Sequence, residues 1–551
     1  MSRGLTVKLR RTSQALFFLL FLFLLFRTEL KGALGAGSDI HLRSPVRLFF
    51  LLDPLVAISN ALATHALYRG LVVSLVILIP TMFLGRFFCG WICPMGSLNH
   101  FVGNLKWYTK RGKNLVQSNR YKPWQTTKYF VLAVVLVAAF FGTALVGWFD
   151  PFSLLVRSLG LSILPALNYA ANGVFLPLEH AHIDWLASTA GTIHGTLRTS
   201  LLSFKQPMFL QGALLGFLLL LLLALNLRIT RFWCRALCPL GALLGVTSRW
   251  SIFGLHKDPS TCNQCNRCEM HCQGGDDPIG GVPWRKAECH MCMNCVDACP
   301  HGSLQFKFFR KGNEVAGTSL DRRKAITGLA AGALAVPLLR STPGLAKGRD
   351  EHLIRPPGAL DETDFLSRCI RCGECMKVCP NNSLHPTFTE AGIEGLWSPM
   401  LQPRIGYCEP SCVLCSEVCP TGAIWKITPR EKGWVVGVEG GSNPIRLGTA
   451  FYDRGRCLPW AMATDCIVCE EWCPVSPKAI YVQEAEVIDS QGSVKKLKQP
   501  HVDPKRCVGC GACEYACPLQ EHPAVHVTSI GESRSSANQI LLTRKNGKAK
   551  S

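Results

Sequence analysis

Long apolar runs separated by basic loops fill the first 250 residues of the chain. Runs of this composition predict membrane-spanning helices, and four of them cover residues 15–26, 71–84, 129–148 and 208–225. The first run is short of the ~20 residues that a span needs, and no cleavage site follows it before Arg27. We therefore expect an anchor rather than a cleavable signal peptide, and a bundle of four spans over residues 1–250.

Basic residues set the expected orientation of these spans. The loop between the second and third spans has no acid and carries Lys106, Lys110, Arg111, Lys113, Arg120, Lys122 and Lys128. Because basic loops stay on the cytoplasmic side of a membrane, this loop and the N-terminus are expected inside. Residues 150–206 are then outside. There we expect His180, His182 and His194 to be solvated loop residues rather than ligands.

A sequence repeat follows two of the spans. Residues 86–96 read RFFCGWICPMG and residues 231–241 read RFWCRALCPLG, so each copy carries Cys-x3-Cys-Pro. An Asp-Pro pair precedes each copy upstream, at Asp53 and Asp150. The repeat cysteines are Cys89, Cys93, Cys234 and Cys238. Two interpretations of them stay open: one shared four-thiolate metal site, or reduced thiols at helix ends in a reducing compartment.

The cysteines between residues 251 and 310 have the spacing of a bacterial ferredoxin. Two runs of Cys-x2-Cys-x2-Cys-x3-Cys consist of Cys262, Cys265, Cys268 and Cys272, and of Cys289, Cys292, Cys295 and Cys299. In this pattern three cysteines bind one 4Fe-4S cluster and the fourth serves the neighbouring cluster. Zinc also binds paired cysteines, but it does not require a third cysteine at the same step. We expect a cytoplasmic ferredoxin domain with two clusters.

Four further cysteine groups fill residues 365–530, and a proline follows the fourth cysteine of each. The groups are Cys369, Cys372, Cys375 and Cys379; Cys408, Cys412, Cys415 and Cys419; Cys457, Cys466, Cys469 and Cys473; and Cys507, Cys510, Cys513 and Cys517. Short β-branched or aromatic stretches, such as residues 423–427 and 479–482, predict the small strands of an α+β ferredoxin-like fold. The groups must pair, but the spacing leaves open whether the first pairs with the second or with the fourth.

A basic stretch and an Ala/Gly-rich apolar run join the two halves at residues 320–346. Arg322, Arg323 and Lys324 precede the run 325–339, and a small-x-small triplet ends at Ala346. This order is similar to a twin-arginine export signal placed in mid-chain, and it predicts that the second ferredoxin domain is exported after its clusters are inserted. A plain fifth span or a buried soluble helix is the alternative. A linker at 347–364 and a disordered tail at 531–551 complete the predicted organisation.

Composition narrows the function classes. All 28 cysteines fall into the groups above, so none remains for a disulfide framework. The hydrophobic share of 48% and the mean hydropathy of +0.19 agree with membrane segments. Much of the net charge of +22 lies in loops beside apolar runs, and no aromatic–basic platform indicates nucleic-acid binding. No haem attachment motif, transmembrane histidine pair, acid–base pair or nucleophile stands out, which leaves redox chemistry.

Cations stand next to several cysteines, at Arg267, Arg371, Lys377 and Arg506. A nearby cation raises the potential of a cluster because it favours the reduced, more negative state. A role in surface solubility is the alternative, and the sequence favours it.

These motifs resemble two known families. Residues 1–310, with both Cys-x3-Cys-Pro motifs and the following cluster pair, resemble the NapH/MauN quinol-dehydrogenase membrane ferredoxins. Residues 320–551, with RPPGAL at 355–360, RCIRC at 368–372 and the four irregular groups, resemble the NapG/MauM exported ferredoxins. The two families are usually separate proteins, and here they are joined. The predicted fold class is thus a membrane α-helical bundle, with four spans and a mid-chain signal or anchor helix, joined to α+β ferredoxin-like 4Fe-4S domains.

The resemblance implies a multi-pass protein of the bacterial inner membrane that passes electrons from quinol to a periplasmic reductase. Nitrate reductase is the best-known client, and methylamine dehydrogenase is another. The expected cofactors are six 4Fe-4S clusters, with the repeat cysteines as a candidate seventh metal site. The expected partners are the quinone pool, a periplasmic reductase or cytochrome c, and the twin-arginine export machinery. A rival hypothesis is a maturation or docking factor for a periplasmic redox enzyme. No ligand for a mid-membrane haem is found, so quinol itself is a candidate for the carrier that crosses the bilayer.

Overall fold

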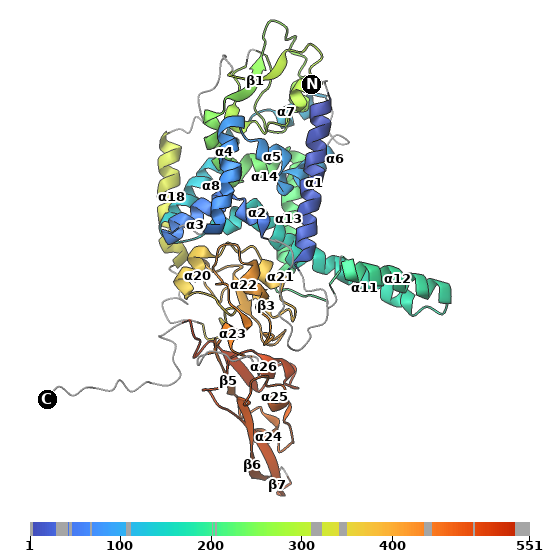
Figure 1. Cartoon of the computed structure of the whole chain (residues 1–551), viewed down its shortest axis with the longest axis vertical. Helices are drawn as coiled ribbons and strands as arrows, with labels where there is room; N and C mark the ends of the chain where they lie inside the picture. Colours follow the sequence, from blue (N-terminus) through green and yellow to red (C-terminus); the bar gives the residue numbers. More distant parts are fainter. Residues whose placement is uncertain are drawn as a thin grey trace, which may run out of the picture.

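A computed structural model gives the fold of the chain (Figure 1). It describes residues 4–28, 42, 47–66, 69–105, 112–200, 202–203, 206–280, 282–309, 322–340, 350–434, 444–488 and 491–534. The predicted cleavage site at Ala346 and the tail after residue 534 lie outside these residues. The molecule is elongated (Figure 1). A helical half, residues 5–250, occupies the middle. A small domain, residues 253–308, lies at one end and is called the inner domain, and a larger one, residues 350–534, lies at the other end and is called the outer domain.

Apolar helices build the helical half. Its elements are α1 (Leu5–Arg27), α2 (Leu48–Leu51), α3 (Pro54–Thr64), η1 (Arg69–Ser74), α4 (Leu75–Leu84), α5 (Phe87–Trp91), α6 (Pro94–Leu105), α7 (Gly112–Asn119), η3 (Pro123–Thr126), α8 (Thr127–Phe140), α9 (Val146–Phe149), α10 (Pro151–Ser158), η4 (Leu159–Ile163), α11 (Leu164–Glu179), α12 (Asp184–Ser200), α13 (Gly212–Arg228), α14 (Phe232–Ala236), α15 (Pro239–Thr247) and η5 (Ser248–Trp250). Leu55, Val135 and Leu155 have no exposure and belong to one core shared by helices far apart in sequence.

Within the part of the chain that the structure describes, three helical stretches are long and apolar enough to cross a membrane: Leu5–Arg27, Gly112–Phe140 and Pro151–Glu179. Two of the predicted spans correspond to shorter apolar helices, Leu71–Leu84 and Gly212–Arg228. The predicted span 129–148 is not one helix, because α8 ends at Phe140 and the chain turns before α9 begins.

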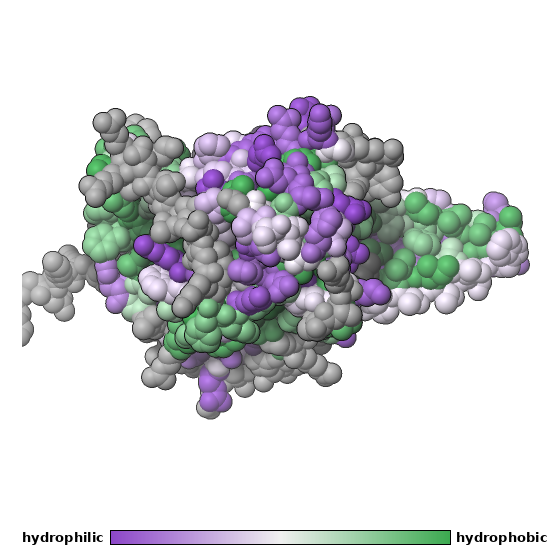
Figure 2. Space-filling view, turned by 90° about the horizontal axis from the view of Figure 1, so that it is seen from above, coloured by the Kyte–Doolittle hydropathy of each residue, from purple (hydrophilic) through white to green (hydrophobic). Residues whose placement is uncertain are grey.

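The segment predicted as an outside loop is helical, so this expectation is wrong. Helices α10, α11 and α12 occupy most of it, and α11 and α12 form a hairpin that projects sideways from the body (Figure 1). His180 and His182 are exposed as expected, but His194 is buried. Its ring nitrogen lies 2.6 Å from the Glu179 carboxylate at the end of α11, and this contact joins α12 to α11. Figure 2 shows hydrophobic residues along this hairpin and hydrophilic residues over the inner domain.

Short helices and two-stranded sheets form both end domains. The inner domain has β1 (Phe253–Lys257), α16 (Arg267–Met270), η6 (Lys286–Glu288), α17 (Asn294–Ala298) and β2 (Leu304–Phe308). The outer domain has α20 (Glu362–Arg368), α21 (Glu374–Lys377), β3 (Leu384–Pro386), β4 (Pro399–Leu401), α22 (Leu414–Val418), α23 (Pro429–Lys432), β5 (Thr449–Tyr452), α24 (Leu458–Ala461), α25 (Val468–Glu471), β6 (Ile480–Ile488), β7 (Val494–Val502), α26 (Ala512–Ala516) and β8 (Val525–Thr528). The pairs β1–β2, β3–β4, β5–β8 and β6–β7 are antiparallel.

Two strand predictions have different outcomes. The stretch 479–482 corresponds to the start of β6, which confirms the prediction. The stretch 423–427 is not a strand: Ile424 forms only an isolated bridge with Ala359. The partner strand is missing there because the chain segment opposite, part of the predicted linker, folds into the outer core. Ile354 and Arg355 of that segment are almost fully buried.

The apolar run at the junction forms α18 (Arg322–Arg340), which packs along α8. Gly328 faces Phe130, and Gly332 lies so close to α8 that a β-carbon on it would be 2.8 Å from Val137. Small residues four apart let two helices approach closely, as they do in membrane helix pairs. The run is therefore integrated with the helical half.

Candidate functional site

The cysteine groups meet in pairs, and each fourth cysteine crosses to the partner group. The six resulting sets are Cys262, Cys265, Cys268 with Cys299 (set 1); Cys289, Cys292, Cys295 with Cys272 (set 2); Cys369, Cys372, Cys375 with Cys419 (set 3); Cys408, Cys412, Cys415 with Cys379 (set 4); Cys457, Cys466, Cys469 with Cys517 (set 5); and Cys507, Cys510, Cys513 with Cys473 (set 6). In the outer domain the first group therefore pairs with the second, and the third with the fourth.

The outer sets lie in a row that leads away from the helical half. Set 3 touches it directly, because Ile370 and Cys372 belong to the core of the helical half. Set 4 meets set 6, where the Cys408 backbone N–H donates to the Cys510 carbonyl at 2.8 Å. Set 5 is the pair partner of set 6 and lies farthest out, near α24 and α25 (Figure 1). The order from the helical half is 3, 4, 6 and 5.

The four repeat cysteines converge on one place. Cys89, Cys93, Cys234 and Cys238 are all buried and lie beside one another. The Gly241 N–H donates to the Cys238 sulfur at 3.3 Å. These thiols lie on or beside α5 and α14, between the inner domain and the helices α2 and α3 (Figure 1). The convergence favours one shared four-thiolate site over separate reduced thiols.

Two buried arginines accompany the repeat cysteines, one from each copy of the repeat. Arg86 lies 4.0 Å from the Cys89 sulfur, and Arg231 donates to the Cys89 carbonyl at 3.0 Å. Both side chains are fully buried. Because a cluster of thiolates is anionic, buried cations beside it reduce the cost of placing that charge in an apolar core.

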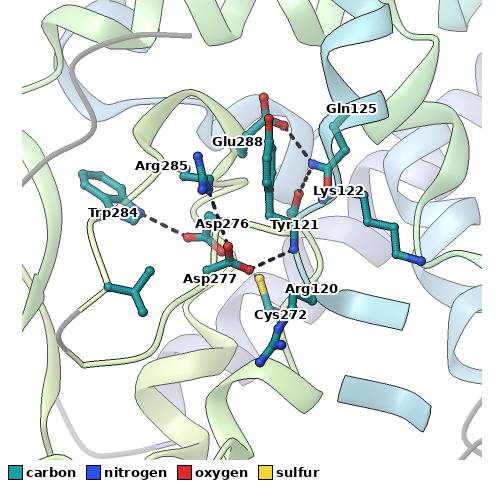
Figure 3. Close-up of polar contacts among 12 residues, drawn as sticks. Arg120, Tyr121, Lys122, Gln125, Cys272, Asp276, Asp277, Trp284, Arg285 and Glu288 are labelled. Carbon is teal, nitrogen blue, oxygen red and sulfur yellow. Dashed lines mark hydrogen bonds and ion pairs between the residues drawn. The ribbon is translucent and has the colours of Figure 1, made fainter. Parts of the chain in front are cut away.

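Polar contacts hold the inner domain against the helical half (Figure 3). Asp277 accepts from the Tyr121 backbone N–H at 2.8 Å. Within the inner domain, Asp277 also lies 3.5 Å from Arg285. Gln125 donates to the Glu288 carboxylate at 3.1 Å. The basic segment that predicts an inside loop is therefore also the docking surface for the acids of the inner domain.

The Glu288 carboxylate is the centre of this contact. It is buried and accepts hydrogen bonds from Lys128 and from the Tyr129 hydroxyl. Burial alone would raise the pKa of Glu288, but Lys128 and Arg86 outweigh it and hold the pKa below its ordinary value. One cation thus links the inner domain to the repeat cysteines, because Arg86 also contacts Cys89.

Set 2 lies directly against the repeat cysteines. The Trp91 indole donates to the Met291 carbonyl at 2.9 Å. Gly90 packs so closely on the His290 carbonyl that a β-carbon would lie 2.2 Å from it. Both contacts join residues within two positions of the cysteines of set 2 and of the repeat, so the inner domain and the repeat cysteines share a direct interface.

Two arginines hold set 3 against the other end of the helical half. Arg371 donates to the carbonyls of Ala144 and Glu394, and to that of Cys369 at 3.3 Å. Arg157 donates to the carbonyls of Gly147 at 3.0 Å and Arg371 at 2.9 Å. Set 3 is thereby fixed on the loop between α8 and α10.

The two Asp-Pro pairs are helix starts that meet. Asp53 and Asp150 have no exposure and cap α3 and α10, where their carboxylates accept backbone N–H groups. Proline at the first position of each helix costs no hydrogen bond. The two carboxyl groups also contact each other.

The four cations near cysteines divide into two kinds. Arg267 and Arg506 are exposed, which agrees with a role in solubility. Arg371 and Lys377 are buried, and Lys377 donates to the carbonyl of Leu25 at 2.7 Å. For these two residues the solubility interpretation is wrong, because both hold the outer domain against the helical half.

Two polar contacts to cluster cysteines were not predicted. The Lys432 ammonium lies 3.4 Å from the Cys408 sulfur, and the Tyr452 hydroxyl lies 2.9 Å from the Cys469 sulfur. Lys432 is 24 residues from Cys408 in sequence, so only the fold brings it to the sulfur. Its position at the end of α23 gives no signal in the sequence.

We expect Lys432→Met to lower the midpoint potential of the set 4 cluster by about 60–120 mV, because a hydrogen bond to a charged group contributes ~1.5–3 kcal/mol and ~1.4 kcal/mol is 59 mV for one electron. The reduced cluster carries more negative charge and loses more from the missing cation. Potentiometric titration of the electron-spin signals measures the shift. Lys426→Met, at an exposed lysine, is the matched control and should leave every potential unchanged. An unchanged set 4 potential in Lys432→Met would contradict this role.

The loops between the cysteines have the shape that a cluster needs. Residues on both sides of a second cysteine adopt positive φ, as at Gln264 and Asn266 and again at Met291 and Met293. Backbone N–H groups donate to cysteine sulfurs of these sets, as from Ile424 to Cys419 at 3.4 Å. All 28 cysteines lie within the described residues and none forms a disulfide. In the same residues no three His, Cys, Asp or Glu side chains are arranged around a single metal ion.

Comparisons with known proteins agree with these loops. Models of 4Fe-4S binding domains match residues 66–112 with 209–257, 365–385 and 286–309, and a model of a 4Fe-4S dicluster domain matches 462–520. The chain is 33% identical over 179 residues to the methylamine utilization ferredoxin-type protein MauM of Methylorubrum extorquens, which is 32% of this chain and 72% of MauM. The chain belongs to the MauM/NapG family of ferredoxin-type proteins. No solved structure matches it.

Membership of the MauM/NapG family is supported by a second relative. The chain is 32% identical over 206 residues to the ferredoxin-type protein NapG of Escherichia coli, which is 37% of this chain and 80% of NapG. The helical half also matches a family model. Both copies of the Cys-x3-Cys-Pro repeat fall within the residues that a 4Fe-4S binding domain model matches. The chain thus carries several 4Fe-4S binding domains in one polypeptide.

Proposed function

We propose that this chain is a membrane electron-transfer protein that takes electrons from quinol and delivers them to a periplasmic redox enzyme. The observation that carries the proposal is the placement of the cysteine sets. Sets 1 and 2 lie at one end of the helical half, sets 3 to 6 at the other, and the repeat cysteines lie between them. Each cluster would accept and donate one electron at a time.

The repeat cysteines are the proposed seventh cluster site. In this proposal they carry electrons across the helical half, from set 2 to set 3. Set 2 and the repeat cysteines share a direct interface, and set 3 is held at the opposite face by Arg157 and Arg371. The protein residues position the thiolates, neutralise their charge and exclude water from the path. No movement of quinol between the two faces is required in this scheme.

The proposed location is the bacterial inner membrane, with the inner domain in the cytoplasm and the outer domain in the periplasm. Basic residues next to the inner domain support this orientation. The helix α18 connects the two domains and packs on α8, which supports a fifth span that stays as an anchor after twin-arginine export.

Set 5 is the proposed exit to the client enzyme. It is the last set in the row, and Met462 and Trp472 beside it are among the exposed large apolar residues. The client is proposed as a periplasmic reductase or a cytochrome c. One relative, MauM, is named for methylamine utilization, and another is NapG. Our leading proposal for the client is an enzyme of the nitrate-reductase type.

Reduction by a quinol tests the function directly. Anaerobic, detergent-purified full chain is mixed with menadiol, and the electron-spin signals of reduced clusters are recorded after freezing. We expect signals within the time of mixing by hand, at a fraction of the intensity that dithionite produces. Signals with dithionite but none with menadiol would contradict the proposal and favour a maturation or docking factor with static clusters.

A further inference from the structure

The hairpin of α11 and α12 exposes apolar side chains to its surroundings. In α11, which the structure describes in full, no exposed residue carries a charge or an amide. Leu167 is 53% exposed, Tyr169 73% and Val174 58%. The stretch Pro151–Glu179, which contains α11, is long and apolar enough to cross a membrane. A hairpin that is surrounded by water turns such side chains inward, and this one does not.

Polar side chains lie between the two helices instead. The two ring nitrogens of His194 lie 2.6 Å from the Glu179 carboxylate and 3.1 Å from the Asn172 amide oxygen. Arg198 donates to the same amide oxygen at 3.2 Å. Polar contacts between helices whose outer surfaces are apolar are typical of helix pairs in membranes. The distribution of polar groups therefore indicates a lipid environment around the hairpin.

Hydroxyl groups on the exposed side of α12 have their partners within the helix. Thr189, Thr192 and Thr196 are exposed, and each donates to the backbone carbonyl four residues earlier, at 2.6, 2.9 and 2.8 Å. A hydroxyl that is paired in this way does not need water as a partner. Trp185 at the start of α12 is 70% exposed, and tryptophan is enriched where a membrane meets water. Helix α12 therefore suits the boundary between acyl chains and headgroups.

The hairpin runs across the long axis of the molecule, whereas α1 runs along it (Figure 1). It therefore does not cross the layer that α1 crosses. Figure 2 is seen from the end of the inner domain, so it shows the side of the hairpin that is turned toward the level of the helical half, and hydrophobic residues lie along that side. The base of the hairpin lies against set 3, where a β-carbon on Gly373 would be 3.2 Å from the Leu161 side chain.

We propose that this hairpin lies in the outer leaflet of the membrane and parallel to its plane, an inference that rests on the proposed membrane location. Helix α11 lies against the acyl chains and α12 toward the headgroups, so the buried apolar area binds the hairpin to the lipid. The hairpin continues from α10 through η4 without a break. Because Arg157 of α10 donates to the Arg371 carbonyl at 2.9 Å, the hairpin fixes set 3 at the height of the outer membrane surface.

Photo-cross-linking tests what surrounds the hairpin. The full chain is placed in vesicles of phosphatidylethanolamine and phosphatidylglycerol, with p-benzoylphenylalanine in place of Val174, and is irradiated and digested. We expect phospholipid adducts at residue 174 in the mass spectra. The same substitution at Phe388, which is 55% exposed in the outer domain, is the matched control and should give none. The substitution at Leu19, which is 62% exposed on α1, reports whether the helical half is in the bilayer.

The three positions separate the possible outcomes. Adducts of residue 174 with a second copy of the chain and not with phospholipid would overturn the inference, and so would the absence of adducts there. If residue 19 gives phospholipid adducts and residue 174 does not, the hairpin assignment is wrong and the proposed membrane location stands. If neither position gives them, the proposed location itself fails.

A pair of lysine substitutions tests which helix faces the acyl chains. Backbone amides of residues 166–178 should exchange at least about tenfold faster in Leu176→Lys than in the unchanged chain in the same vesicles. The reason is that a leucine loses its burial and a lysine is costly among acyl chains. Ser188→Lys, at an exposed position of α12, should leave this exchange unchanged. Equal exchange in the two variants would contradict the assignment of α11 to the acyl side.

Discussion

Replacement of two repeat cysteines, Cys234→Ala with Cys238→Ala, is expected to stop electrons at the inner domain. Menadiol should still reduce sets 1 and 2, because neither substitution touches their ligands. Sets 3 to 6 should stay oxidised over the time in which menadiol gives their signals in the unchanged chain. The reason is the position of the repeat cysteines between set 2 and set 3, with no other described cysteine set in the helical half.

The measurement is freeze-quench electron-spin spectroscopy, with signals assigned to inner and outer sets by their potentials. Dithionite should reduce the outer sets of the variant, which shows that they are intact. Val246→Ala is the matched control and should behave as the unchanged chain. Val246 is exposed and lies near the end of α15, the helix that Cys238 caps. Rapid reduction of the outer sets by menadiol in the double variant would mean that quinol enters from the outer side.

Arg371→Met is expected to detach set 3 from the helical half. The guanidinium satisfies three backbone carbonyls from three segments, and methionine fills the space but donates nothing. Of these carbonyls only that of Ala144 belongs to the helical half. An unsatisfied buried carbonyl costs about 1–3 kcal/mol, so the docked state should weaken by about fivefold to a hundredfold. Transfer from the repeat cysteines to set 3 should slow accordingly.

Hydrogen exchange measures the weaker docking of set 3, and reduction kinetics measure the slower electron transfer. Amides of residues 144–149 and 369–372 should exchange faster in Arg371→Met, and reduction of the outer sets by menadiol should slow while reduction of the inner sets does not. Arg506→Met is the control, since Arg506 is exposed and pairs only with Asp503 on the surface among the described residues. Unchanged exchange at both segments would show that the outer domain is held by other contacts.

The cysteine sets were predictable because their chemistry depends on local spacing. In sets 1, 2, 3 and 6 three thiols lie within seven residues, which is the spacing that wraps one cluster. The pairing of the outer groups was not predictable, since β5 pairs with β8 across more than 70 residues. A site shared by the repeat cysteines was one of two open interpretations. Their convergence depends on contact between the two copies, as where Arg231 of the second copy donates to the Cys89 carbonyl of the first at 3.0 Å.

The helical half was predicted less well for a physical reason. Hydropathy detects apolar length, but it cannot tell a helix that crosses a bilayer from one that turns along its surface. The hairpin of α11 and α12 was therefore taken for a loop, and buried His194 for a solvated residue. The cations Arg371 and Lys377 were misjudged for the same reason: burial comes from a second domain that local sequence does not reveal.

Iron content tests the continuous path most directly. Anaerobically purified full chain should contain about 28 iron atoms and as many acid-labile sulfides, four for each of six sets and four for the repeat cysteines. About 24 of each would leave the repeat cysteines empty and contradict a path through the helical half. A colourless protein that holds zinc in place of iron would contradict the whole account.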